Sequence, residues 1–285
     1  MEIRNICVLG AGMMGYQIAQ LVAINGYDVT LVDMEDTIVK HALDTINGNL
    51  KKFFVDKGKI SPDEMDAVME RIKGTTVLKE AVNGVEIVIE TVSEQLELKQ
   101  RIFKELDEIC APETILASNT TTFMITDIGS LTRRQGRTIG IHFFNPVAAM
   151  KLIEIVRGVK TSDETYEVIK GLAIKLGKEI VTVNDSPGLA VSRLYLILVN
   201  EAARLVHEGV ASAEDVDKGC RLGLGHAMGP LRTSDMINGI GIANHGLAYM
   251  RAILGDDYNP CPLIRKKFLA GEMGESAGKG FHSYD

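Results

Sequence analysis

The sequence contains a glycine-rich motif, Gly10-Ala11-Gly12-Met13-Met14-Gly15, with the spacing G-x-G-x-x-G. An apolar run at residues 6–9 leads into it, and apolar residues at helical spacing follow it. Glycines at these positions allow a tight turn and let the backbone approach a pyrophosphate, which rests on the N-terminus of the following helix. In this setting the motif predicts a dinucleotide-binding turn.

Asp33 ends the next apolar run, residues 29–32. A carboxylate at this place could accept hydrogen bonds from the ribose hydroxyls of a dinucleotide, although an ordinary strand-end turn residue would look the same. Residues 34–36 are Met, Glu and Asp, so none of them is an arginine that could bind the 2′-phosphate of NADP. The combination favours NAD over NADP.

His142 and Glu154 could carry acid–base chemistry. Oxidation of an alcohol needs a base for the hydroxyl proton, and histidine titrates near neutrality. A carboxylate on the second ring nitrogen would fix the tautomer and stabilise the imidazolium. His142 ends an apolar run and Glu154 lies in the next one, so the two could pair. The spacing alone also fits a structural histidine.

The elements that must position these residues alternate between short β-branched runs and longer helical patterns, as in a parallel α/β sheet. Expected strands cover residues 6–9, 29–32, 85–89, 115–117, 138–142, 152–156 and 180–183. Helices are expected after the glycine motif, over about 36–56, from Ser61-Pro62 onward, over 96–109, and between the last two strands.

The pattern changes near Asp185-Ser186-Pro187-Gly188, beyond which only helices are expected, at about 189–207, 213–222, 233–253 and 263–269. We therefore predict an α/β domain over residues 1–185 and an all-helical domain over residues 186–285. The run 194–199 is apolar on every face, which predicts burial on all sides and a subunit interface.

Composition excludes several classes of function. Hydrophobic residues make up 46% and charged residues 24%, the balance of an ordinary globular protein. A net charge of −7 argues against nucleic-acid binding, and no apolar run approaches the roughly 18 residues that a membrane span needs. The N-terminus resembles neither a secretory nor a transit peptide. Four scattered cysteines without metal-ligand spacing indicate reduced thiols, no metal site and a cytoplasmic location.

Longer motifs resemble the short-chain L-3-hydroxyacyl-CoA dehydrogenases, including the bacterial 3-hydroxybutyryl-CoA enzymes. In chain order they are GAGMMG, IVIETVSEQLELKQ, Ala117-Ser118-Asn119-Thr120-Thr121, HFFNPV, MKLIEIV, DSPG, LGHAMGP and SAGKGFHSY. The resemblance implies a Rossmann-like NAD-binding domain followed by a helical domain through which subunits form a homodimer. It also implies NAD as cofactor, a short (S)-3-hydroxyacyl-CoA as substrate, and a place in fatty acid and butanoate metabolism.

Carried over by position, the resemblance makes His142 the catalytic base and Glu154 its partner carboxylate. It assigns cofactor contacts to the glycine motif and to Asp33, Glu94, Lys99, Asn119 and Asn145, with Asn145 beside the nicotinamide. Thr121 and Ser192 would act at the substrate, and Lys52 and Lys57 would bind coenzyme A phosphates. Without the resemblance, Glu94 and Lys99 would be a solvated helix-start pair, and Lys57-Gly58-Lys59 a solvated connector.

The chain departs from the family on the substrate side. Thr121 stands where the family has serine, Ser192 where it has asparagine, and His282 where it has tyrosine. Arg232 stands where an acid is usual, and a buried cation near the site would suit a free acid. Two alternatives therefore stay open: a dehydrogenase of a β-hydroxy acid or ring alcohol without coenzyme A, and an NAD-binding protein without turnover.

Overall fold

The computed structural model describes residues 2–284, which divide into two units. The first contains the chain up to Thr120 together with Met124–Asp185, and the second contains Thr121–Phe123 together with the chain from Ser186 onward. No helix among the described residues is both long and apolar enough to cross a membrane.

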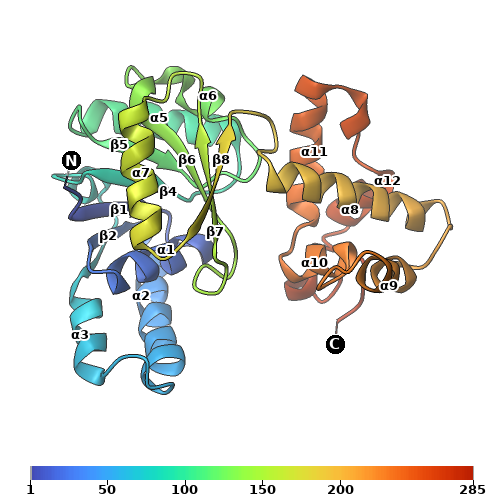
Figure 1. Ribbon diagram of the computed structural model, residues 1–285, viewed down its shortest axis with the longest axis horizontal. Coiled ribbons are helices and arrows are strands. Elements are labelled where there is room, and N and C mark those ends of the chain that lie inside the picture. Colours follow the sequence, from blue (N-terminus) through green and yellow to red (C-terminus); the bar gives the residue numbers. More distant parts are fainter. Residues whose placement is uncertain (1, 285) are drawn as a thin grey trace. The chain divides into compact units, whose positions relative to one another are not determined.

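An eight-stranded sheet forms the centre of the first unit, in the order β3-β2-β1-β4-β5-β6-β7-β8 (Figure 1). The strands are β1 (Asn5–Leu9), β2 (Asp28–Val32), β3 (Ile72–Thr75), β4 (Ile87–Glu90), β5 (Ile115–Ser118), β6 (Thr138–Phe143), β7 (Leu152–Arg157) and β8 (Glu179–Asn184). Strands β1 to β6 are parallel, β7 runs antiparallel to β6, and β8 runs parallel to β7. The predicted Rossmann-like sheet is confirmed, with β3 as an additional edge strand.

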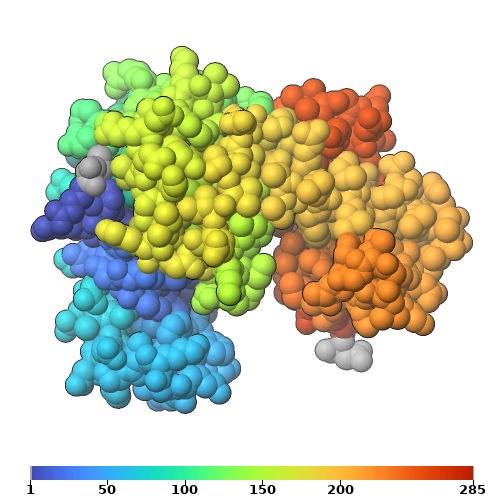
Figure 2. Space-filling view, viewed as in Figure 1, coloured from blue at the N-terminus to red at the C-terminus, as the bar shows by residue number. Residues whose placement is uncertain are grey.

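Helices cover this sheet because their apolar faces repeat at helical spacing. They are α1 (Met13–Ile24), α2 (Asp36–Leu50), α3 (Pro62–Glu70), α4 (Leu78–Ala81), α5 (Leu96–Ile109), α6 (Ile125–Ile128) and α7 (Asp163–Lys175), with short segments η1 (Lys51–Val55), η2 (Gly129–Leu131) and η3 (Gln135–Arg137). The pair α2 and α3, light blue to cyan, projects from the rest of the first unit (Figures 1 and 2). The helix expected from Ser61-Pro62 onward is α3; Ser61 caps its N-terminus, and Glu64 completes a capping box.

The second unit is helical apart from isolated bridges near its end. Its elements are α8 (Val191–His207), α9 (Ala213–Gly223), α10 (Pro230–Met236), α11 (Ile240–Leu254), η4 (Asp256–Tyr258), α12 (Pro262–Leu269) and η5 (Glu275–Ala277). Buried apolar residues of α8, α10, α11 and α12 form one core, with Leu196, Val199 and Leu247 inaccessible to solvent.

One expectation for the helical part is wrong in detail. The helix expected over 233–253 is broken, because Asn238 adopts a left-handed φ of 53° between α10 and α11. The Asn238 side chain instead accepts hydrogen bonds from Ser276, so the break receives the C-terminal segment. Within this chain α8 leaves Leu194 75% exposed and Ile197 37% exposed, so burial of the run on every side stays a prediction that requires a partner subunit.

Candidate active site

The glycine motif lies between β1 and α1, and its glycines meet different needs. Gly10 has a φ of 101°, a conformation that side chains disfavour. A Cβ on Gly15 would stand 1.7 Å from the Gly10 carbonyl oxygen, so only glycine allows this contact between turn and helix. A Cβ on Gly12 would meet nothing within 4 Å, and no side chain caps the start of α1. The turn therefore leaves open space beside a helix N-terminus, which fits a pyrophosphate.

Asp33 directly follows β2 and reaches across to this turn. One carboxylate oxygen accepts the Ala11 N–H at 2.7 Å, and the other accepts the Met34 N–H at 2.7 Å. Each carboxylate oxygen has a second lone pair, so a ribose hydroxyl could still donate to it. Met34 beside it is exposed and offers no cation to a 2′-phosphate.

A buried ion pair underlies the end of β4. Lys99 Nζ lies 2.7 Å from Glu90 Oε1, and neither side chain is accessible to solvent. Ser118 Oγ and the Val92 N–H also donate to Glu90. Burial lowers the pKa of Lys99, but the carboxylates of Glu90 and Glu94 outweigh it and raise that pKa above its usual value. Lys99 is therefore a buried cation, and the alternative of a solvated lysine is wrong.

Glu94 and Asn119 extend this network toward the ends of neighbouring strands. Glu94 lies 3.4 Å from Lys99 Nζ and accepts a 2.7 Å hydrogen bond from Thr120 Oγ1. Asn119 follows β5, and its Oδ1 accepts the Phe143 N–H of β6 at 2.8 Å. Glu90, which unites these groups, was missed by sequence reasoning because an acid inside an apolar run reveals its partner only once the fold is known.

His142 and Glu154 are direct cross-strand neighbours in the antiparallel pair β6 and β7. Residues opposed in this way project to the same face, and His142 Nδ1 lies 2.8 Å from Glu154 Oε2. His142 is 5% exposed and Glu154 is fully buried. A carboxylate at Nδ1 accepts the proton there, which leaves Nε2 as the basic nitrogen.

The loop after β6 carries Asn145, and two side chains hold it. Gln17, on the second turn of α1, donates to Asn145 Oδ1 at 3.0 Å and accepts the Val147 N–H at 2.9 Å. Lys178 donates to the carbonyls of Val147 and Met150. Sequence reasoning missed Gln17, although its position one helical turn after Met13 places it beside the glycine motif.

These groups share one edge of the first unit. The glycine motif, Glu94, Asn119 and Asn145 follow the carboxyl ends of β1, β4, β5 and β6, and β1 and β4 flank the point where strand order reverses. In open α/β sheets, ligands bind in the crevice at that point. The edge therefore combines a pyrophosphate turn with an acid–base pair.

Thr121 and Ser192 belong to the second unit, where Ser192 is buried near the start of α8. The departures Arg232 and His282 lie in this unit too. Arg232 is partly exposed, lies 3.2 Å from Glu275, and stacks over the Tyr284 ring, so it is not a fully buried cation. His282 Nε2 lies 2.8 Å from Asp217 Oδ2.

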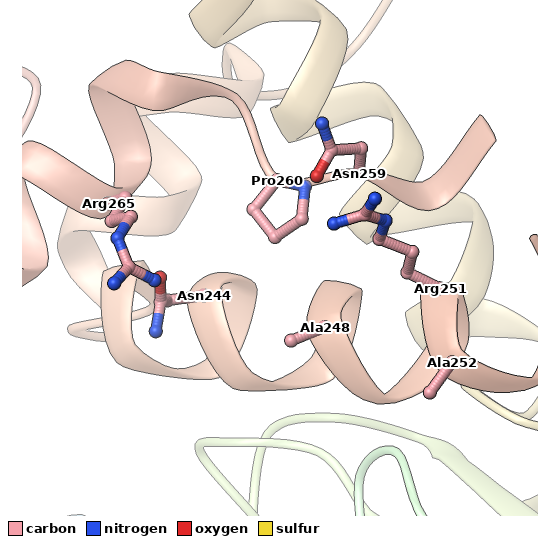
Figure 3. A pocket seen from close by; sticks show the side chains of 7 residues that line it. All are labelled: Asn244, Ala248, Arg251, Ala252, Asn259, Pro260 and Arg265. Carbon is pink, nitrogen blue, oxygen red and sulfur yellow. The ribbon is translucent and has the colours of Figure 1, made fainter. Parts of the chain in front are cut away.

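The remaining candidates are two lysines, a hollow and a possible metal cluster. Lys52 and Lys57 are exposed at the tip of the α2–α3 pair, and Lys52 lies over the Phe53 ring. A hollow of about 400 Å³ in the second unit contains none of the predicted site residues (Figure 3). Its lining includes Arg251 and Arg265. No cluster of three metal-ligating side chains occurs among residues 2–284.

Comparison with known proteins agrees with this geometry. Residues 5–186 match the family described as "3-hydroxyacyl-CoA dehydrogenase, NAD binding domain", and residues 188–284 match "3-hydroxyacyl-CoA dehydrogenase, C-terminal domain". The chain is 43% identical to a "Probable 3-hydroxybutyryl-CoA dehydrogenase" of Bacillus subtilis, covering 100% of this chain and 99% of the relative. It is 38% identical to the "3-hydroxybutyryl-CoA dehydrogenase" of Bradyrhizobium diazoefficiens, covering 99% and 96%. The crystal structure of (S)-3-hydroxybutyryl-CoA dehydrogenase PaaH1 from Ralstonia eutropha superposes with a TM-score of 0.92 at 37% identity, covering 100% of both chains.

Proposed function

The chain belongs to the 3-hydroxyacyl-CoA dehydrogenase family, and on that premise we propose that it oxidises a short (S)-3-hydroxyacyl-CoA reversibly to the 3-oxoacyl-CoA with NAD. The B. subtilis, Bradyrhizobium and Ralstonia relatives are named for 3-hydroxybutyryl-CoA, which is the substrate we propose. One observation carries the proposal: a buried His142–Glu154 pair stands at the same sheet edge as the glycine turn.

In the proposed mechanism, Nε2 of His142 accepts the proton of the substrate hydroxyl as the carbon–oxygen bond becomes a carbonyl. Glu154 keeps the other ring proton on Nδ1 and stabilises the imidazolium that results. In the reverse direction His142 returns the proton to the oxygen. NAD supplies the hydride acceptor when it is bound.

The first unit supplies cofactor selectivity in this proposal. The turn at Gly12 receives the pyrophosphate, because it leaves open space for one. Asp33 accepts hydrogen bonds from the ribose hydroxyls, because its carboxylate already lies against the turn. Asn119, Asn145 and Glu94 would contact the nicotinamide half. A 2′-phosphate would meet the Asp33 carboxylate without a compensating cation.

The substrate is tested by a panel of acyl-CoA thioesters and free hydroxy acids with NAD or NADH, followed at the nicotinamide absorbance. We expect turnover of acetoacetyl-CoA and 3-hydroxybutyryl-CoA and none of the free acids. His142→Gln should lower kcat by about 10² to 10⁴, the range for a positioned general base, with NADH affinity unchanged. Turnover of a free acid with none of the thioesters would contradict the proposal.

Further parts of the proposal concern assembly and binding. We propose a homodimer through the second unit, residues 186–285, supported by the exposed apolar side chains of Leu194 and Ile197 on α8. Leu194→Glu should then halve the mass seen by light scattering. Val210→Glu, at another exposed apolar position outside the helices, is the control.

We also propose that Lys52 and Lys57 bind coenzyme A phosphates, supported by their exposure, while Thr121 and Ser192 contact the acyl group. Four free cysteines favour a reducing, cytoplasmic environment.

A further inference from the structure

We infer that Gln17 is a positioning residue: it fixes the carboxamide of Asn145 so that the Asn145 N–H groups face a carbonyl oxygen of the bound ligands. The inference rests on the proposed function. It goes beyond the glycine motif, which ends at Gly15 and does not include position 17.

The orientation of Gln17 follows from its backbone partners. The Val147 N–H can only donate, so the Gln17 atom 2.9 Å away is the carbonyl oxygen. The Met13 carbonyl can only accept, so the atom 2.8 Å from it is the amide nitrogen. The positions of the oxygen and the nitrogen of the Gln17 carboxamide are therefore fixed by one backbone group that can only donate and one that can only accept.

The orientation of Asn145 follows in turn. The second N–H of Gln17 points at Asn145 at 3.0 Å, and only an oxygen can receive it. Asn145 Oδ1 therefore accepts the Gln17 hydrogen bond, and Asn145 Nδ2 points away from Gln17. Within residues 2–284 Nδ2 makes no hydrogen bond, and Asn145 is partly exposed at the sheet edge that carries His142. A donor presented in this way suits the carboxamide oxygen of nicotinamide or the ketone oxygen of the substrate.

Gln17 is one of several anchors of the loop that carries Asn145. Lys178 donates to the carbonyls of Val147 and Met150, and the Val147 side chain is fully buried. The distinctive contribution of Gln17 is therefore the direction of one amide. This separates a positioning role from a structural one, because the two roles rank substitutions differently.

Two substitutions give the test. Gln17→Glu keeps the shape and can still accept the Val147 N–H, but it cannot donate to Asn145. Asn145 would then rotate its amide to donate to the new carboxylate and turn its oxygen toward the ligand. Gln17→Met removes every hydrogen bond of the side chain, so the Asn145 amide can adopt either orientation. A structural role predicts that the glutamate variant is the milder one, whereas the positioning role predicts that it is the more severe.

The readouts are the Kd of NADH, from nicotinamide fluorescence, and the KM and kcat for acetoacetyl-CoA. We expect a loss of about two- to fivefold for Gln17→Met and about tenfold or more for Gln17→Glu, since the first only releases the Asn145 amide, whereas the second turns its oxygen toward the ligand oxygen. A loss in NADH affinity identifies the nicotinamide oxygen as the acceptor. A loss confined to acetoacetyl-CoA identifies the substrate oxygen.

Both substitutions are repeated in an Asn145→Ala background, which removes the oriented amide but keeps any repulsion between the introduced carboxylate and the pyrophosphate. The excess loss in Gln17→Glu should disappear there. Asn25→Ala, which removes a comparable side-chain contact to the Leu21 carbonyl at the far end of α1, is the control and should change neither readout.

An excess that persists without Asn145, or a glutamate variant milder than the methionine variant, would overturn the inference. NADH binding can be read without turnover, so a wild-type enzyme that ignores acetoacetyl-CoA would refute the proposed substrate while this ranking still decides the role of Gln17.

Discussion

Substitution of Glu154 by Gln tests how much of the proposed rate depends on one buried charge. The carboxylate lies 2.8 Å from His142 Nδ1, and both side chains are almost completely buried. Two unit charges about 4 Å apart at an effective dielectric constant near 20 attract by about 4 kcal/mol. Glutamine keeps the hydrogen bond to Nδ1 but loses the charge, so we estimate a net loss of about 3 kcal/mol in stabilising the developing imidazolium. This corresponds to a kcat lower by roughly 10².

The assay is kcat at saturating NAD and 3-hydroxybutyryl-CoA, with the KM of both substrates and the melting temperature measured in parallel. Asp107→Asn is a matched control, because Asp107 is another buried, ion-paired carboxylate of the first unit, bound to Arg134 at 2.7 Å. The control should lower stability and leave kcat unchanged. A Glu154→Gln enzyme that kept more than about a third of wild-type kcat would refute the electrostatic reasoning.

Three further predictions concern the cofactor, the buried ion pair and the response to alkali. NAD should exceed NADP by at least about tenfold in kcat/KM, or about 1.4 kcal/mol, and equal use of both would show that Asp33 does not contact the ribose. Lys99→Met should lower the free energy of unfolding by about 3–5 kcal/mol, measured by chemical denaturation, because it leaves the Glu90 carboxylate buried without its cation. Adding Glu90→Gln should recover part of that loss. Burial raises the pKa of Cys110 from 9.0 to about 11, so its contribution to stability is complete below pH 9 and is lost as the pH rises through 11. Denaturation curves across this window should show a smaller pH dependence in Cys110→Ala than in the wild type.

Sequence pattern predicted the elements whose hydrophobic period is strong and missed those set by tertiary contacts. Strand β4 is buried on every residue, and its first three residues, Ile-Val-Ile, form a continuous apolar run. Strand β3 was missed because it lies at the sheet edge and contains the exposed Lys73 and Gly74. The break between α10 and α11 depends on a hydrogen bond from Ser276, which is distant in sequence from Asn238.

The candidate site likewise contains residues that the sequence predicts and residues whose roles depend on tertiary contacts. The glycine motif and the roles of His142 and Glu154 could be proposed from residue type, order and resemblance. The buried state of Lys99 could not, because an exposed and a buried lysine look alike at the start of an amphipathic helix. The role of Gln17 could not be predicted either, because Asn145 and Val147, with which it forms hydrogen bonds, follow β6 and are distant from it in the sequence.

The cross-strand placement of His142 and Glu154 has a consequence for how the enzyme can change over evolution or in engineering. Their pairing is set by strand register, which the buried neighbours Ile141, Ile153 and Ile155 fix through the core. The connection between the two strands includes exposed residues at 148–150, so its tip can lengthen or shorten without altering which residues face each other. This loop can therefore diversify while the acid–base pair is inherited unchanged. A one-residue shift in either strand, by contrast, would turn the histidine and the carboxylate to opposite faces and abolish activity in a chain that still folds.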